Sequence, residues 1–149
     1  MPFTTSWYVT DRVIYEKFTG FVSFEEIAEV VRLGEEYQEK AGKNALHFIA
    51  DITELQSLPL NIVQLRNIQL KPPPKKGMTV VVSSPNHRVN HVVTFFAKLM
   101  RTIFGLRYKM FPSIEEAYAY LQEVDSTLRD LKPTEATQPA TEETITESS

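Results

Sequence analysis

The chain has 149 residues and a formal net charge of −3, from 16 Lys and Arg against 19 Asp and Glu, and this length fits one domain with a substantial core. It contains no cysteine, which excludes disulfides, thiol catalysis and cysteine–zinc sites. The charge is segregated, because residues 55–114 contain no Asp or Glu while the residues on either side are acidic. Such a field can attract an anionic partner or the protein's own acidic helices. The cations of this stretch are Arg66, Lys71, Lys75, Lys76, Arg88, Lys98, Arg101, Arg107 and Lys109.

Two short strands and a helix are predicted in the first third of the chain. Residues 7–10 and 12–18 are rich in aromatic and β-branched side chains, which favours two strands pairing antiparallel. Ser23 followed by Glu26 is a capping box, and the apolar spacing after it predicts a helix to about Ala41. Gly42 supplies the stop signal.

The middle of the chain alternates strand and helix signals. The apolar run 45–50, closing on Asp51, predicts a strand buried on both faces, as in parallel sheets. Residues 59–70 predict a second helix, and the three prolines that follow predict a loop. Residues 78–83 predict another buried strand. Ser84 and Pro85 predict the N-cap and first turn of a third helix that runs to about residue 104.

The last third of the chain predicts an edge strand, a helix and a tail. Residues 107–111 alternate partly, which favours an edge strand with Arg107 and Lys109 in water. A second capping box at Ser113 opens a helix with apolar spacing to about Leu131. Residues 132–149 are dominated by Thr, Glu and Ser, which predicts a disordered acidic tail after a domain spanning 1–131.

The order of elements, β-β-α-β-α-β-α-β-α, predicts an α/β fold. Alternating strands and helices indicate a mostly parallel sheet of about five strands, with right-handed crossovers. The expected architecture is one domain with an N-terminal antiparallel pair and four helices.

Three features together resemble the SpoIIAA-like, or STAS-like, domains over about residues 7–131: the repeated strand–helix turns, the strand ending in Asp51-Ile52-Thr53, and the ending 111–121, which reads FPSIEEAYAYL. The segment 84–105 also resembles the third helix of uncharacterised bacterial members. The resemblance implies a small regulatory or binding module without a cofactor. Members of the wider family bind protein partners, nucleotides or, in some relatives, lipids. Antagonists of the family carry a phosphorylated serine in Asp-Ser-Ser-Gly; residues 51–59 here read DITELQSLP, so no phosphosite is carried over.

A ligand site is predicted beyond the carboxyl ends of the parallel strands, where open α/β sheets bind ligands. The amino end of the third helix would face an anion there; alternatively, the serine only caps the helix and the arginine is solvated. The candidate ligand-binding residues are Asp51, Thr53, Ser83, Ser84, His87 and Arg88.

Two catalytic interpretations of the same residues are disfavoured. A triad of Ser83 or Ser84 with His87 and Asp51 lacks the Gly-x-Ser-x-Gly elbow of hydrolases. A zinc site at His87 and His91 has helical spacing but no carboxylate close in sequence. His47 is expected to find a hydrogen bond within its strand.

The third helix is unusually apolar, with one polar stripe that contains His91, Lys98 and Arg101. Such a helix packs in a core, or part of its surface meets a second subunit or an anionic membrane, where basic stripes beside aromatics are favoured. The predicted partner or membrane surface comprises Lys75, Lys76, Phe95, Lys98, Arg101, Arg107 and Lys109.

The leading hypothesis is a non-enzymatic regulatory or binding module that contacts an acidic protein partner or an anionic small ligand. The alternatives are a peripheral lipid-binding or membrane-binding domain and, disfavoured, a small hydrolase. Homodimerisation through the third helix or the edge strand is left open, and no nucleic-acid motif is recognised. The lack of cysteine, of a signal-peptide pattern and of an apolar run of ~20 residues favours the cytoplasm. The hypothesis requires the cations to gather on one surface, unpaired with glutamates of the first and fourth helices.

Overall fold

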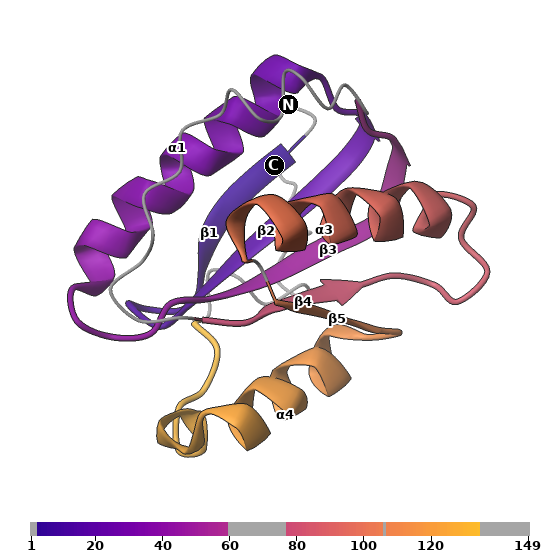
Figure 1. The fold of residues 1–149 in the computed structure, drawn as a ribbon. Helices are drawn as coiled ribbons and strands as arrows, with labels where there is room; N and C mark the ends of the chain where they lie inside the picture. Colours follow the sequence, from indigo (N-terminus) through magenta and orange to yellow (C-terminus); the bar gives the residue numbers. More distant parts are fainter. Residues whose placement is uncertain (1–2, 60–76, 106, 135–149) are drawn as a thin grey trace, which may run out of the picture.

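The protein, described here from a computed structural model over residues 3–59, 77–105 and 107–134, is built on one five-stranded sheet. The strand order is β1-β2-β3-β4-β5. The first pair is antiparallel and the other three are parallel, as predicted (Figure 1). The strands are β1 (Phe3–Val9), β2 (Val13–Phe21), β3 (His47–Ser57), β4 (Thr79–Val82) and β5 (Tyr108–Phe111).

Three α-helices lie in the described residues: α1 (Phe24–Ala41), α3 (Asn90–Phe104) and α4 (Ile114–Val124), with a short 3-10 turn, η1 (Ser126–Leu128). The architecture therefore has three of the four predicted helices, because the helix predicted at 59–70 falls, apart from its first residue, outside the described residues. Lys75, Lys76 and the tail from residue 135 fall outside them too. α1 and α3 cover one face of the sheet and α4 covers the other (Figure 1).

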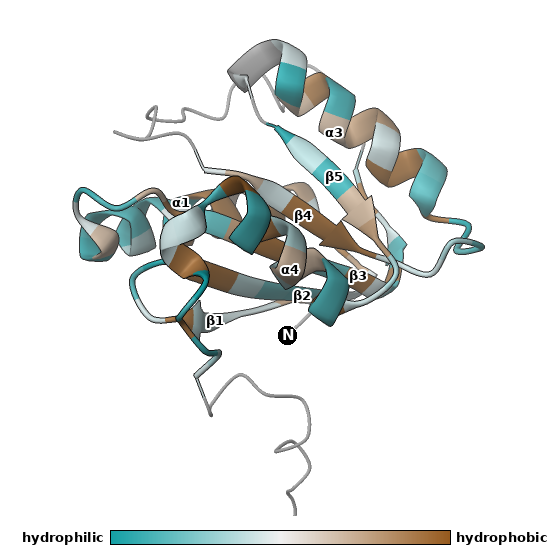
Figure 2. Cartoon of the chain, turned by 90° about the horizontal axis from the view of Figure 1, so that it is seen from below, coloured by the Kyte–Doolittle hydropathy of each residue, from teal (hydrophilic) through white to brown (hydrophobic). Residues whose placement is uncertain are grey.

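The sheet is buried from both sides, which explains the unbroken apolar runs of β3 and β4. On one face, Phe18 and Val81 pack with Ile27 of α1 and Val93 of α3. On the other face, the buried residues of the sheet pack against α4 and η1 through Ala117, Leu121 and Leu128. Figure 2 shows β4 as almost wholly hydrophobic, whereas β5 begins with hydrophilic residues. The two faces together provide the apolar burial that holds the fold.

α1 begins and packs as its sequence predicts. Ser23 accepts a hydrogen bond from the Glu26 amide, and the Glu26 carboxylate accepts one from the Ser23 amide, so the capping box is complete. Near its other end, Tyr37 packs on Trp7 of β1, with 4.7 Å between ring centroids. This contact joins α1 to the edge strand.

Two strand boundaries differ from the prediction. β1 begins at Phe3 rather than residue 7. β3 does not end near Asp51 but continues to Ser57, because β2 runs alongside it and pairs Thr19 with Glu54 and Phe21 with Ser57. The register between β2 and β3 shifts twice along this stretch, so the added part of β3 is irregular. The sequence there lacks the alternation of apolar and polar residues that predicts a strand.

Two helix boundaries are also corrected. α3 begins at Asn90, so Ser84 is not its N-cap; Val89 holds that position, without a side-chain cap. The preceding loop turns twice, with the His87 amide bonded to the Ser84 carbonyl and the Asn90 amide bonded to the His87 carbonyl. α4 ends at Val124 instead of about residue 131. η1 follows and places Leu128 in the core, so the apolar spacing continues without an α-helix.

Candidate functional site

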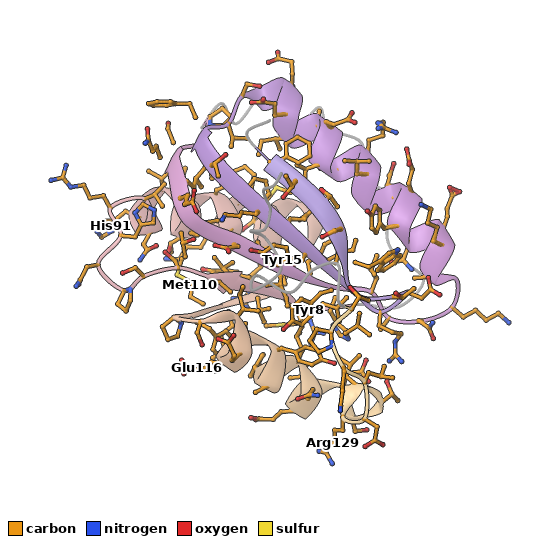
Figure 3. All side chains as sticks on the ribbon, turned by 180° about the vertical axis from the view of Figure 1, so that it is seen from behind. Tyr8, Tyr15, His91, Met110, Glu116 and Arg129 are labelled. Atoms are coloured by element: carbon orange, nitrogen blue, oxygen red, sulfur yellow. The ribbon has the colours of Figure 1, made fainter. Side chains whose placement is uncertain are left out.

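Asp51, the centre of the predicted rim site, is committed to holding the sheet together. Its side chain is buried and accepts hydrogen bonds from the Tyr15 hydroxyl at 2.5 Å and from the amide and hydroxyl of Thr53 at 3.0 and 2.7 Å. Figure 3 shows Tyr15 among the strands of the sheet. Because both carboxylate oxygens are engaged, Asp51 and Thr53 stabilise the irregular part of β3.

The serines of the rim are also engaged or turned away. Ser83 is buried and donates to the Asn90 side-chain oxygen at 2.5 Å. Ser84 is exposed, and its carbonyl accepts from the Asn90 amide group at 2.9 Å. Asn90 therefore closes this loop with its side chain, and the predicted anion site at a serine-capped helix start is not formed.

The two basic residues of the predicted rim site do not complete a catalytic or metal centre. Within the described residues, His87 Nε2 is buried without a hydrogen-bond partner, and Arg88 is exposed without an ion pair. Asp51 and Ser83 bond elsewhere, so a triad with His87 is not assembled. Nowhere in the part of the chain described here do three His, Asp or Glu side chains gather to hold a metal. His91 points away from the fold near the start of α3 (Figure 3).

At the amino end of the parallel strands, a buried histidine ties the last helix to the sheet. His47 donates from Nε2 to the Asp125 carboxylate at 2.9 Å, because its Nδ1 accepts from the Met78 amide at 3.0 Å. Arg12 pairs with the same carboxylate at 3.4 Å and also contacts Thr127. The sequence predicted a hydrogen bond for His47 but missed this network, since Asp125 lies 78 residues away.

The charge of Asp125 is stabilised by this network. Partial burial works to raise the pKa of Asp125, but hydrogen bonds from Thr127 and His47 outweigh it and hold the pKa at about 2. The carboxylate is therefore ionised at neutral pH, and the paired Arg12 balances its charge. Asp125 thus serves as a structural anchor for η1.

A pocket of about 250 Å³ lies at the same end of the sheet, where α3 ends and β4 and β5 begin. We call it the arginine pocket; its lining residues are Met78, Arg101, Arg107, Tyr108 and Tyr120. Both arginines are exposed and, within the described residues, form no ion pair. Among the described residues, no carboxylate lines the pocket. The hollow therefore offers two guanidinium groups and two phenols to a ligand.

The backbone beneath the pocket is closely packed. Arg107 donates to the Gly77 carbonyl at 3.4 Å, and a Cβ at residue 77 would lie 1.7 Å from the Leu46 carbonyl oxygen. Only glycine fits so close to another strand's backbone. This contact fixes the segment that leads into Met78 and places the Gly77 carbonyl within reach of Arg107.

A third cation lies beside the pocket. Lys109 Nζ is 4.7 Å from the centre of the Tyr120 ring and 5.8 Å from that of Phe111, which are cation–π distances. Tyr120 thus contacts Lys109 while it lines the pocket. The aromatic ring holds the ammonium group at the rim.

α3 carries two of the described cations of the acid-free stretch, Lys98 and Arg101. Val93, Ala97 and Met100 are buried, and Val93 packs with residues of the sheet, so core packing accounts for that face of the helix. Lys98 is exposed one turn before Arg101, and Phe95 is 46% exposed. Arg88, by contrast, precedes the first turn, roughly 20 Å from Arg101 along the helix axis. The described cations therefore do not form one patch. For these residues, the expectation of a single basic face is wrong, because Arg88 lies apart from the others.

Comparison with known proteins identifies the fold. No family model matches the chain, and a search of curated proteins finds no match. Among solved structures, the chain is similar to an uncharacterised protein of the DUF3478 family with a SpoIIAA-like fold from Shewanella loihica PV-4. The two are 17% identical, with a TM-score of 0.54, and the match covers 80% of this chain and 93% of that one. The chain therefore has a SpoIIAA-like fold, as the sequence resemblance predicted.

Proposed function

We propose that the protein is a non-enzymatic binding module that recognises a carboxylate or phosphate group in the arginine pocket. The observation that carries the proposal is the convergence of Arg101 and Arg107, from different elements, on a hollow without a carboxylate. Guanidinium groups bind carboxylates and phosphates through paired hydrogen bonds. A SpoIIAA-like fold is typical of regulatory modules of the STAS type, which supports a regulatory rather than catalytic role.

The shape and lining of the pocket favour a small anionic group with an apolar neighbour. Tyr108 and Tyr120 are half-buried and line the pocket, so they supply aromatic surface to its walls. Met78 adds a buried apolar contact. An acidic side chain of a partner protein and a free small anion both present this chemistry. The module is expected to bind either source more weakly as salt concentration rises.

The proposal is tested by calorimetric titration at low ionic strength with two probes, pyrophosphate and a glutamate-rich peptide. Arg107→Ala and Arg101→Ala should each weaken binding of the responding probe about tenfold, since a charge-assisted hydrogen bond contributes about 1.5–3 kcal/mol. Arg88→Ala is the matched control, an exposed arginine at the other end of α3, and should change nothing.

The two probes also separate the two kinds of partner. Binding of the peptide alone indicates an acidic protein partner, and binding of pyrophosphate alone indicates a free anion. Absence of binding by both probes at low salt, or equal losses in Arg88→Ala and Arg107→Ala, would exclude the arginine pocket as the binding site.

A second candidate function, peripheral binding to an anionic membrane, is favoured by Phe95. Its ring is exposed on α3, and Lys98 is exposed three residues further along the same helix. An aromatic beside a cation suits the interface of an anionic bilayer. Within the described part of the chain, no helix has the length and apolarity that crossing a membrane requires.

Sedimentation with vesicles of phosphatidylserine and phosphatidylcholine tests the membrane alternative. If it is right, Phe95→Ser and Lys98→Glu will release the protein from the vesicles while leaving pyrophosphate binding intact. Retention of vesicle binding in both variants would reject a role for α3.

Self-association is the remaining proposal for a partner. β5 is an edge strand of four residues and carries the exposed Lys109, a combination that discourages strand pairing between copies. A dimer through the exposed side of α3 is therefore favoured over one through β5.

A further inference from the structure

We propose that the acidic segment 135–149 binds the arginine pocket of its own chain and competes there with the external anion. The inference rests on the proposed function, because it uses the same pocket. Residues 135–149 lie outside the described residues, but their sequence contains no Lys or Arg. Their acidic residues are Glu135, Glu142, Glu143 and Glu147.

The segment starts from a fixed point on the sheet. The amide of Thr134 donates to the Tyr8 carbonyl at 2.7 Å, and its hydroxyl donates to the Trp7 carbonyl at 2.9 Å. Both acceptors lie near the end of β1. Residue 135 therefore begins at a known place, although its own position is not described.

That starting point lies at the same end of the sheet as the arginine pocket. Because β1 is antiparallel to β2, its last residue, Val9, pairs with the first residue of β2, Val13, which pairs in turn with His47 at the start of β3. β4 and β5 begin at this end as well. Figure 1 shows the last described segment rising from η1 to this end of the strands.

The length of the segment distinguishes its glutamates. The pocket and the end of β1 are separated by the width of the sheet, four strand spacings or about 19 Å. Glu142 follows Thr134 by eight residues, which span up to about 26 Å, and Glu143 and Glu147 reach further. Glu135 adjoins Thr134 and cannot cover the distance. Glu142, Glu143 and Glu147 can therefore occupy the pocket, and Glu135 provides an internal control.

Charge and tethering both favour the contact. Arg101, Arg107 and Lys109 form no ion pair with another described residue, so their charge is available. A tether of this length gives an effective concentration of about 1 mM. Weak pairing is then enough to occupy the pocket for much of the time, and an external anion must displace the segment.

Two other cations compete for the glutamates. Arg129 and Lys132 are exposed and lie close in sequence to Thr134, and Arg129 points into solvent near η1 (Figure 3). Neither lines the arginine pocket. The test must therefore distinguish the arginine pocket from this nearer pair.

The experiment uses the full chain with a single nitroxide label on Ile145→Cys, which is selective because the chain has no cysteine. Paramagnetic broadening of amide signals should centre on Arg107, Tyr108 and Lys109 at low salt. It should disappear in the double variant Glu142→Gln/Glu143→Gln and in Arg107→Glu, and persist in Glu135→Gln and Arg129→Glu. Broadening confined to residues around Arg129 and Lys132, or spread evenly over the molecule, overturns the inference.

Pyrophosphate titration separates the inference from the function it rests on. The double variant Glu142→Gln/Glu143→Gln should bind pyrophosphate about threefold to tenfold more tightly than the native chain. Equal affinity of the two proteins, without broadening at the pocket, overturns the inference and leaves the proposed function standing. Broadening at the pocket with no pyrophosphate or peptide binding by either protein supports occupation of the pocket by the segment but rejects both the competition and the proposed function.

Discussion

Glu16 is a buried acid that forms no ion pair with another described residue. It lies on β2, opposite Thr5 of β1, and only 5% of its surface is exposed. One carboxyl oxygen, Oε2, has no hydrogen-bond partner among the described residues. Burial raises the pKa of Glu16 to about 8, and its proximity helps to raise the pKa of Tyr37 on α1. The group is therefore mostly protonated at neutral pH, which avoids an unpaired buried charge.

This burial predicts a stability that falls as pH rises. Between about pH 4.5 and 8 the folded protein keeps a proton on Glu16 that the unfolded chain releases, so the free energy of unfolding decreases across this window. The full loss is on the order of 5 kcal/mol. Glu16→Gln should remove this dependence and be more stable than the native chain at pH 8.

Urea unfolding at pH 5, 6.5 and 8 measures the effect of Glu16. Asp130→Asn, a change at an exposed acid, serves as the control and should follow the native profile. A native profile that is flat from pH 5 to 8, or a Glu16→Gln profile as steep as the native one, would contradict the assignment.

At the scale of the element, the loop before α3 shows how a side chain can replace the expected cap. The serine–proline pair at 84–85 predicted the start of the helix, yet Asn90 bonds to Ser83 and to the Ser84 carbonyl and begins the helix six residues later. Sequence rules favoured the serine because serine is common at N-caps. They could not anticipate that two turns would come first.

A helix that begins at Ser84, as the sequence predicted, and a helix that begins at Asn90, as in the structure, predict opposite effects of mutation on stability. Asn90→Ala should destabilise the protein by about 1–3 kcal/mol, because it removes the partner of the buried Ser83 hydroxyl. Ser84→Ala should be nearly neutral, although a serine N-cap would be expected to cost about 1 kcal/mol. Thermal unfolding of both variants decides the matter. A loss in Ser84→Ala that equals the loss in Asn90→Ala would support the sequence-based start of α3.

At the scale of the whole molecule, the fold was predictable because its signals are local. Apolar runs, capping boxes at Ser23 and Ser113, and the alternation of strands with helices each act over a few residues. The order, the antiparallel first pair and the edge position of β5 follow from them and are confirmed. The extension of β3 was missed because it depends on where β2 ends.

The candidate site was less predictable because it depends on contacts between distant segments. Arg101, Arg107 and Lys109 were chosen for charge alone, and nothing in the sequence indicated that Tyr120, from α4, would join them. The network of His47 and Asp125 is also formed across the chain. The rim prediction missed a contact of the same kind, since Asp51 had local signals of a ligand and has a structural partner far away in sequence, Tyr15.

Trp7, whose ring packs at a tilt against Tyr37, is the sole tryptophan of the chain and lies on β1, the edge opposite β5. The protein therefore carries one tryptophan fluorophore, and its emission, excited selectively at the red edge of the absorption band, reports on the junction of β1 and α1. An anion in the arginine pocket is four strands away from Trp7, so it cannot quench the tryptophan emission by direct contact. A shift in that emission on titration would then be a sign that the sheet transmits strain from one border to the other.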